Sequence, residues 1–395
     1  MTTKLRAASF QDNAVTTAKI AANAVTNAKI ADDLVPAVNL GRRNVVINGA
    51  MQVAQRSTSE TGLGASHGYF TVDRFQHNHN GNSAGRYTSS QTASGLDGFP
   101  NCLKLDCTTA DTSIGAAERF FINYQMEGQD IQHFKKGTSS AKDFVVSFYA
   151  KANGNFTYVC GFYDANNNRT VSRTFSVTSN WQRFTINFGA DTTGVFSNNN
   201  ALSLQLRWYL HAGSNYTGGT LQTVWDAVTN NETAGGMTSS FFSSTDNEFF
   251  LTGVQLEVGA ESDGTSVATP FEHRSFTEER QLCYRYYYQM KAATNFMKIG
   301  HGRAYDSNNT TATYPVPVPM RANPTGSVSA ASHVGTAGLS AGGTTSTNAA
   351  SETMDDYSRF AINVTRSGGG YSAGTIYQIE SDNNTNMTIK LDAEL

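Results

Sequence analysis

The sequence predicts an all-β protein, and three features of its composition support that prediction. Only 15% of the 395 residues are charged, well below the roughly 25% found in ordinary soluble domains. Gly, Ser, Thr and Asn replace the missing charge, and these residues favour turns and the outer faces of sheets. The chain also has 17 Tyr and 23 Phe, which favour strands over helices. We expect a short repeat segment followed by two β domains.

The N-terminal segment, residues 1–43, contains two copies of one decapeptide, NAVTTAKIAA and NAVTNAKIAD, at residues 13–32. They lie in a series in which every fifth residue is apolar. A five-residue step advances about 140° on an α-helix, so the apolar side chains would spiral around it. On a strand they would alternate between faces. Neither element would be amphipathic. The series is Leu5, Phe10, Val15, Ile20, Val25, Ile30, Val35, Leu40 and Val45.

The repeat therefore predicts a segment that buries its apolar residues only against other copies of the chain. A short homotrimeric shaft, to which each chain contributes one apolar residue per layer, meets this requirement. A disordered leader is the alternative, favoured by the low charge and the weak helix propensity. We expect the trimer contacts to be made by Val15, Ile20, Val25, Ile30 and Val35.

Residues 44–274 read as a series of short strands separated by Gly, Asn and Ser clusters. Apolar and polar residues alternate in several segments, for example 144–148, 156–162, 184–188 and 250–258. Such alternation gives each strand one apolar and one solvent face. No helix of convincing length interrupts them. The spacing predicts a two-sheet sandwich of the jelly-roll type.

The segment ALSLQLRWYLH at 201–211 gives the clearest strand and the candidate site. Leu202, Leu204, Leu206, Trp208 and Leu210 would face the core. The other face would present hydrogen-bonding and aromatic groups suited to a carbohydrate, with Tyr against a sugar ring and the rest bonding hydroxyls. An ordinary solvated face, or one covered by another chain, is the alternative. The candidate residues are Gln205, Arg207, Tyr209 and His211.

We predict that residues 275–290 form a connector, with a helical turn around 278–282 followed by an aromatic strand. Its four tyrosines, at 284, 286, 287 and 288, are expected to pack rather than to bind a ligand. Residues 291–395 predict a smaller β-sandwich domain. Within it, prolines at 315, 317 and 319 indicate an edge strand, and the segment 327–351 is expected to be a surface loop.

Several segments together resemble bacteriophage tail fibre proteins. They are the repeat, NVVINGAMQVAQRST with GYFTVDRF, FFLTGVQLEVG with ATPFEHRSFTEERQLCYRYYYQ, and YPVPVPMRANPTGSVS. Their order spans nearly the whole chain. The centre also resembles jelly-roll carbohydrate-binding modules. The resemblance to tail fibre proteins implies a homotrimeric virion component, assembled in the host cytoplasm, whose N-terminus joins a tail or baseplate protein. It also implies adhesion to bacterial surface polysaccharide or lipopolysaccharide.

The sequence gives little support to other activities. Net charge is −3, which offers no basic surface for nucleic acid. No stretch approaches the roughly twenty apolar residues of a membrane span, so we expect no membrane insertion. Adjacent acidic pairs point to opposite sides of an extended chain and cannot flank one bond. We expect no enzyme activity and no cofactor. The alternatives are a structural tail or baseplate connector and, less favoured, a polysaccharide-degrading enzyme.

Metal ligands and disulfides are not expected either. His77 and His79 would share a strand face and could hold a metal with a third ligand, but a solvated pair is the simpler interpretation. Asp164 with the asparagines at 166–168 has oxygens that suit Ca²⁺, but an Asn-rich hairpin is the simpler interpretation. The four cysteines lack the spacing of a zinc or redox motif. We expect them to be free, buried thiols.

Overall fold

A computed structural model describes residues 43–259, 268–337, 344–351, 357–366 and 368–395. The predicted trimer contacts at Val15, Ile20, Val25, Ile30 and Val35 lie outside the described residues. Residues from Asn44 to Leu395 form one compact unit. Its sheets are antiparallel throughout the part of the chain that the structure describes.

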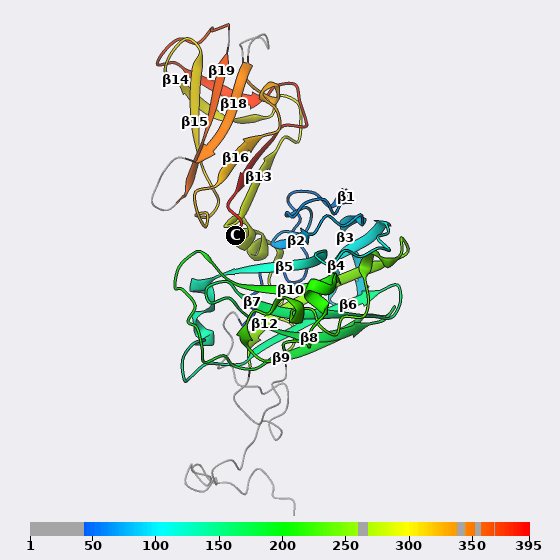
Figure 1. The fold of residues 1–395 in the computed structure, drawn as a ribbon. Coiled ribbons are helices and arrows are strands. Elements are labelled where there is room, and N and C mark those ends of the chain that lie inside the picture. The colour runs from blue at the N-terminus through cyan, green and yellow to red at the C-terminus, as the bar shows by residue number, and fades with distance from the viewer. Residues whose placement is uncertain (1–42, 260–267, 338–343, 352–356, 367) are drawn as a thin grey trace, which may run out of the picture. The chain divides into compact units, whose positions relative to one another are not determined.

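The first sheet of the N-terminal sandwich has the strand order β1-β3-β4-β12-β6-β9 (Figure 1). Its strands come from both ends of the segment, since β12 inserts between β4 and β6. The alternation predicted at 144–148, 184–188 and 250–258 falls on three of them. The strands are β1 (Ser59–Leu63), β3 (Arg86–Leu96), β4 (Phe99–Thr109), β6 (Phe144–Ala152), β9 (Gln182–Phe188) and β12 (Glu248–Val258).

The second sheet has the order β11-β8-β7-β10-β5-β2. The strand predicted at 201–211 is β10, which lies inside this sheet between β7 and β5. The β7–β8 hairpin turns at the asparagines of 166–168, as the hairpin interpretation predicted. The strands are β2 (Phe75–Asn80), β5 (Arg119–Glu127), β7 (Phe156–Asp164), β8 (Arg169–Val177), β10 (Leu202–Ala212) and β11 (Asp226–Ala227).

The two sheets enclose one apolar core, which confirms the predicted sandwich. Trp208 on β10 is fully buried, and its ring meets Phe148 of the first sheet edge to face, with centroids 5.7 Å apart. Phe144 stacks on Phe134 at 4.2 Å. Such aromatic pairs add about 0.5–1.5 kcal/mol each beyond the area they bury. The four cysteines are free and buried, as expected.

The connector forms α2 (Phe276–Tyr284) and then β13 (Tyr287–Lys291). Ser275 begins the helix, because its hydroxyl accepts a hydrogen bond from the N–H of Glu278 at 3.2 Å. The predicted packing of the tyrosines is confirmed: Tyr284, Tyr286 and Tyr287 are buried. The guanidinium of Arg74 lies 3.4 Å from the centre of the Tyr286 ring.

The C-terminal part contains two further sheets, with the orders β13-β21-β16 and β17-β20-β14-β15-β19-β18. Phe360, Ile362, Ile379 and Leu391 lie in their shared apolar core. The remaining strands are β14 (Lys298–Ala304), β15 (Asn309–Pro315), β16 (Thr325–Val328), β17 (Val334–Thr336), β18 (Thr344–Ser351), β19 (Arg359–Arg366), β20 (Ile376–Ser381) and β21 (Thr388–Asp392).

Two predictions for this part are wrong. β15 is an inner strand between β14 and β19, and it ends at Pro315, so the three prolines do not form an edge strand. Prolines at 317 and 319 follow the strand, where no ladder hydrogen bond is needed. The expected loop 327–351 contains the strands β17 and β18 and the end of β16. β16 and β17 pair with strands distant in sequence, whereas β18 pairs with the next strand, β19.

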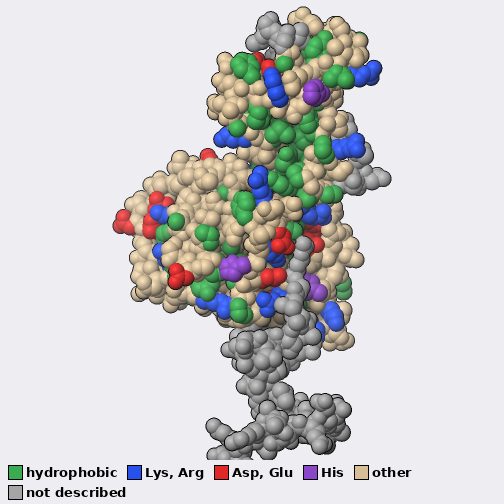
Figure 2. Space-filling model, turned by 180° about the vertical axis from the view of Figure 1, so that it is seen from behind, with side chains coloured by type: hydrophobic (Ala, Val, Ile, Leu, Met, Phe, Trp, Pro, Cys, Tyr) green, Lys and Arg blue, Asp and Glu red, His purple; other side chains and the backbone are tan. Residues whose placement is uncertain are grey.

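Short helical turns complete the described structure. No helix in the described ranges is both long enough and apolar enough to cross a membrane. Most of the surface visible in Figure 2 is neither charged nor apolar, in keeping with the composition. The helical turns are α1 (Ser214–Thr217), η6 (Gly128–Phe134), η7 (Asn230–Glu232), η8 (Phe241–Ser243) and η9 (Ala331–His333).

Candidate functional site

The predicted site lies on the outer face of the second sheet, the face turned away from the sandwich core. Gln205 on β10 lies between Tyr163 of β7 and Gln125 of β5. Arg207 lies between Gly161 and Asn123 in the next row, and Gln76 of β2 continues that row. We call the following six residues the polar patch: Gln76, Asn123, Gln125, Tyr163, Gln205 and Arg207.

Arg207 organises one half of the polar patch. Its Nε donates to Gln205 Oε1 at 2.8 Å, and its Nη1 donates to Tyr209 Oη at 3.1 Å. The guanidinium also lies 4.2 Å from the centre of the Tyr163 ring. Cation–π contact of this kind fixes an arginine side chain while leaving part of it accessible. Arg207 and Tyr163 are indeed half-buried.

The other half of the polar patch contains amide oxygens without partners. Asn123 Nδ2 and Gln125 Nε2 both donate to Gln76 Oε1, at 3.2 and 2.9 Å. Asn123 Oδ1 and Gln125 Oε1 are buried and accept no hydrogen bond from the described residues. A buried acceptor without a donor costs about 1–3 kcal/mol.

Tyr209 lies on the same face as predicted, but it is not exposed. Only 2% of it is accessible. Its ring packs with Phe121 at 5.0 Å and belongs to an apolar cluster with Tyr216 and Ala234. Tyr216 and Ala234 belong to the segment 213–237, which covers the outer face of the second sheet beside Tyr209. Tyr209 therefore cannot serve as an open platform for a sugar ring in this conformation.

The predicted position of His211 is wrong. The β10–β5 register shifts between Tyr209 and His211, so that Tyr209 lies opposite Phe121 whereas His211 lies opposite Phe120. Residues opposite each other on antiparallel strands share a face. Phe120 is a core residue, so His211 points into the sandwich, where it is fully buried and meets Phe242 at 5.2 Å. A β-bulge has reversed its direction.

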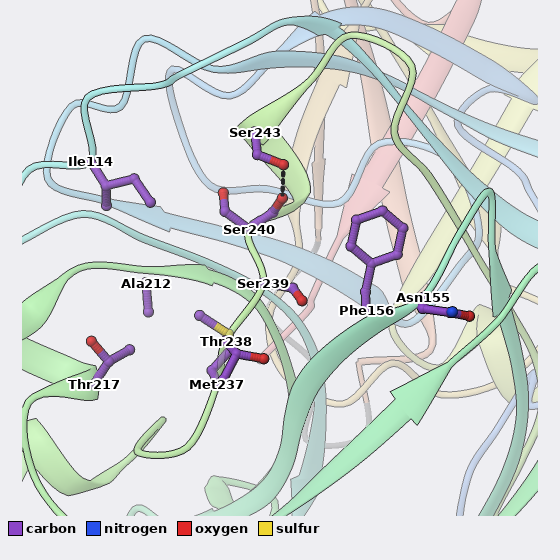
Figure 3. A pocket seen from close by; sticks show the side chains of 10 residues that line it. All are labelled: Ile114, Asn155, Phe156, Ala212, Thr217, Met237, Thr238, Ser239, Ser240 and Ser243. Carbon is purple, nitrogen blue, oxygen red and sulfur yellow. Dashed lines mark hydrogen bonds between the residues drawn. The ribbon is translucent and has the colours of Figure 1, made fainter.

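A pocket of about 440 Å³ opens where β7 begins and β10 ends (Figure 3). Ile114 and Phe156 lie on opposite sides of it, with Ser239 and Ser240 between them. Its lining carries several hydroxyl groups and one amide, but no charged side chain. The lining residues are Ile114, Asn155, Phe156, Ala212, Thr217, Met237, Thr238, Ser239, Ser240 and Ser243.

Some polar groups of the pocket are engaged and others are free to bind. Ser239 Oγ accepts the N–H of Thr157 at 2.9 Å, and Ser243 Oγ donates to the carbonyl of Ser240 at 2.9 Å. The side chains of Asn155 and Thr238 are exposed and make no hydrogen bond within the described residues. The pocket left no signal in the sequence, since its residues come from separate segments without any shared spacing.

His77, His79 and Asp164, which the sequence suggested as possible metal ligands, contact other protein groups instead. His77 Nδ1 and His79 Nε2 both lie within hydrogen-bond distance of Tyr87 Oη, at 2.8 and 2.9 Å. They face the core rather than solvent. Burial lowers the pKa of each imidazole to about 3. Asp164 is fully buried and accepts a hydrogen bond from Lys136 Nζ at 2.6 Å, so a lysine already neutralises it.

No family model and no curated protein matches the chain. Solved structures that it is similar to include jelly-roll carbohydrate-binding modules and a phage tailspike domain. A family 11 carbohydrate-binding module from Clostridium thermocellum, in complex with a mixed-linked tetrasaccharide, is 11% identical; the match covers 51% of this chain and 96% of that chain at a TM-score of 0.25. A xylan-binding domain from Paenibacillus barcinonensis is also 11% identical, with 51% and 92% covered and a TM-score of 0.24.

The tailspike match is the enzymatically active domain of tailspike protein 4 from bacteriophage CBA120. It is 11% identical, covers 55% of this chain and 21% of that chain, and has a TM-score of 0.25. At this level of similarity, the activities and ligands of these proteins do not transfer to the chain. Any function has to be inferred from its own residues.

Proposed function

We propose that the chain is the adhesive subunit of a phage tail fibre and binds a glycan of the host cell surface. In this proposal, three copies join through residues 1–43, which also attach the fibre to the tail or baseplate. The observation that supports glycan binding best is the uncharged, hydroxyl-rich pocket beside Phe156.

The pocket has the chemistry that a neutral sugar requires. A sugar ring offers apolar C–H groups on its faces and hydroxyl groups around its edge. Phe156 can pack against such a face, while Asn155 and Thr238 can exchange hydrogen bonds with hydroxyl groups. A volume of about 440 Å³ falls within the usual 300–1,000 Å³ of ligand pockets. The absence of lysine and arginine from the lining disfavours phosphate or carboxylate groups as the main determinant.

A shallow pocket of this kind is expected to bind weakly, and a fibre compensates for weak sites by presenting many of them. Three copies in each fibre and several fibres in each virion raise the avidity by roughly 10²–10⁴ when the geometry permits simultaneous binding. Weak single sites also allow a particle to move over a surface before it commits to one position.

The proposal is tested with the full chain on immobilised bacterial surface polysaccharides and lipopolysaccharides. Wild-type protein should bind at least one of them. Phe156→Ala and Asn155→Ala should each weaken that binding roughly two- to tenfold, since an aromatic contact and a hydrogen bond each contribute about 0.5–1.5 kcal/mol. Phe296→Ala is the matched control, because Phe296 is 49% exposed and lies outside the pocket. Thermal unfolding verifies that each variant is folded.

The polar patch is the second candidate site, on account of its half-buried Arg207 and Tyr163 side chains. Arg207→Ala distinguishes the two surfaces. Binding that is lost in Arg207→Ala and retained in Phe156→Ala would move the site to β10, as the sequence predicted. If no bacterial polysaccharide binds at any density, the adhesion proposal fails. The connector alternative would then require the polar patch to be buried against another virion protein.

We also propose that the chain binds glycan without cleaving it. The pocket lining contains neither Asp nor Glu, whereas glycoside hydrolysis ordinarily uses a pair of carboxyl groups flanking the bond. Incubation of the chain with a bound polysaccharide should release no reducing ends. Release that persists in highly purified protein would instead support the polysaccharide-degrading alternative.

A further inference from the structure

Three buried side chains that could ligate a metal meet next to the pocket, although they are far apart in sequence. Asp111 follows β4, Glu118 precedes β5 and His211 lies near the end of β10. One ligand atom from each lies within 4.8 Å of the other two. His211 Nε2 and Glu118 Oε2 are 3.3 Å apart. Ligand atoms at about 2.0–2.2 Å from one ion lie closer together than 4.8 Å, so the side chains would move towards the ion as it binds.

No basic side chain of the described residues pairs with the carboxylates of this cluster, although hydrogen bonds from Ser83, Ala84 and Ser113 stabilise the charge of Asp111. Asp111 and Glu118 are 5% and 8% exposed. Within the described residues, no lysine or arginine forms an ion pair with either, and His211 is the partner of Glu118. Two carboxylates buried around one imidazole leave an excess of negative charge in a site of low dielectric. Such a charge is costly unless a cation compensates it.

Neighbouring groups orient two of the three side chains, His211 and Asp111. Ser240 Oγ lies 2.8 Å from His211 Nδ1. If Nδ1 carries the proton and donates it to Ser240, the lone pair of Nε2 points towards the carboxylates, which is the arrangement of metal-bound histidines. Asp111 Oδ2 accepts hydrogen bonds from Ser83 Oγ at 2.7 Å and from the N–H of Ala84 at 2.8 Å.

Glu118 has a carboxylate oxygen available for a ligand. Its Oε1 receives no hydrogen bond from the described residues and is not among the buried atoms, so it is open to solvent. The cluster therefore combines two carboxylates without a basic ion-pair partner, a hydrogen-bonded imidazole and a carboxylate oxygen that no protein donor uses.

We propose that Asp111, Glu118 and His211 bind one divalent transition-metal ion, such as Zn²⁺ or Mn²⁺. Carboxylate ligands suit both ions, and an imidazole ligand favours them over Ca²⁺ and Mg²⁺, which prefer oxygen. Water would complete the coordination. The ion joins the segment 110–118 to β10, and Ile114 of that segment lines the pocket. Metal binding does not depend on the proposed glycan function.

The test uses the full chain without a histidine tag, after treatment with a chelator. Co²⁺ is the spectroscopic probe, and Zn²⁺ competes with it. Wild-type protein should show visible d–d absorption that saturates at one Co²⁺ per chain and disappears on addition of Zn²⁺. Zn²⁺ should also raise the melting temperature, because it binds only the folded site, and Ca²⁺ at the same concentration should not.

Glu118→Gln is the decisive variant, since it keeps the size of the side chain but removes the charge. It should weaken Co²⁺ binding at least about tenfold, because even the loss of outer-shell partners weakens metal binding 10–100-fold. Glu60→Gln, at an exposed position of β1, is the matched control and should bind like wild type. Circular dichroism verifies folding of both variants.

Three results would overturn the proposal. They are Co²⁺ binding that does not saturate at one equivalent, equal affinity of wild type and Glu118→Gln, and a melting temperature of wild type that Zn²⁺ leaves unchanged. The last measurement requires no variant, so a folding defect cannot obscure it. Loss of glycan binding has no bearing on any of these outcomes.

Discussion

His77 shows how one buried side chain can set the pH dependence of stability. It is fully buried on the core side of β2, where Tyr87 Oη lies 2.8 Å from its Nδ1. Desolvation, assisted by the nearby His79, lowers the pKa of its imidazole to about 3. The unfolded chain binds a proton on this residue below about pH 6.5, whereas the folded chain does not do so until about pH 3. Acid therefore favours the unfolded state in this window.

We predict that His77→Phe makes stability less sensitive to acid. Between pH 6 and pH 4, the free energy of unfolding of wild type should fall more steeply than that of the variant, by up to about 1.4 kcal/mol per pH unit. The lost hydrogen bond to Tyr87 changes the absolute stability but not this slope. Urea unfolding at several pH values measures both. Parallel curves for the two proteins would show that His77 is not the group responsible.

The residues of β10 show what alternation can and cannot predict. Gln205 and Arg207 lie on the outer face as the alternation requires. Tyr209 has the predicted direction, but the segment 213–237 covers it, and covering by a distant loop leaves no local signal. His211 is reversed by a bulge, which depends on pairing with β5. The cluster of Asp111, Glu118 and His211 was invisible in the sequence for the same reason, because tertiary pairing alone brings its members together.

At the scale of elements, α2 is the helix whose beginning the sequence specifies most clearly. Ser275 accepts the N–H of Glu278, and the S-x-x-E spacing of these two residues is that of a capping box. We predict that Ser275→Ala lowers the free energy of unfolding by about 1 kcal/mol, the usual effect of losing an N-cap. Thermal or urea unfolding measures the change.

Two further variants test whether the Ser275 hydroxyl stabilises α2 as its N-cap. Ser275→Asp should restore most of the stability, since an aspartate accepts the same hydrogen bond and suits the positive end of the helix. Ser214→Ala should have little effect, because Ser214 is exposed and begins a helix of only four residues. A loss in Ser275→Ala that Ser275→Asp does not recover would point to a packing role for the hydroxyl instead.

Strands in the C-terminal part were harder to predict than those of the sandwich. The sandwich strands carry large apolar residues at alternate positions, such as Phe144, Val146 and Phe148, and one buried face fixes such a strand. β17 and β18 are short or rich in Thr, Ser and Ala. Their strand form depends on hydrogen bonds to partner strands, since β17 pairs with the distant β20 and β18 with the next strand, β19. Composition alone therefore indicated a loop.

For the whole molecule, the number of chains decides whether many weak glycan sites can act together. The five-residue apolar series of the repeat predicts a trimer, and this prediction concerns residues outside the described ranges. Each layer of such an assembly would enclose apolar side chains from three chains. Placing a carboxylate in these layers would bury charges of the same sign close together, which is strongly unfavourable.

We therefore predict that the full chain is a trimer in solution and that Ile20→Asp with Ile30→Asp converts it to a monomer. Light scattering coupled to size exclusion should give three times 42.6 kDa for wild type and 42.6 kDa for this double variant. Thr16→Asp with Thr26→Asp adds the same charge at polar positions of the two repeats and should remain trimeric. If wild type has the mass of one chain, the repeat does not assemble the fibre. If both double variants dissociate, general repulsion between added charges accounts for the result, and the apolar series is not the determinant.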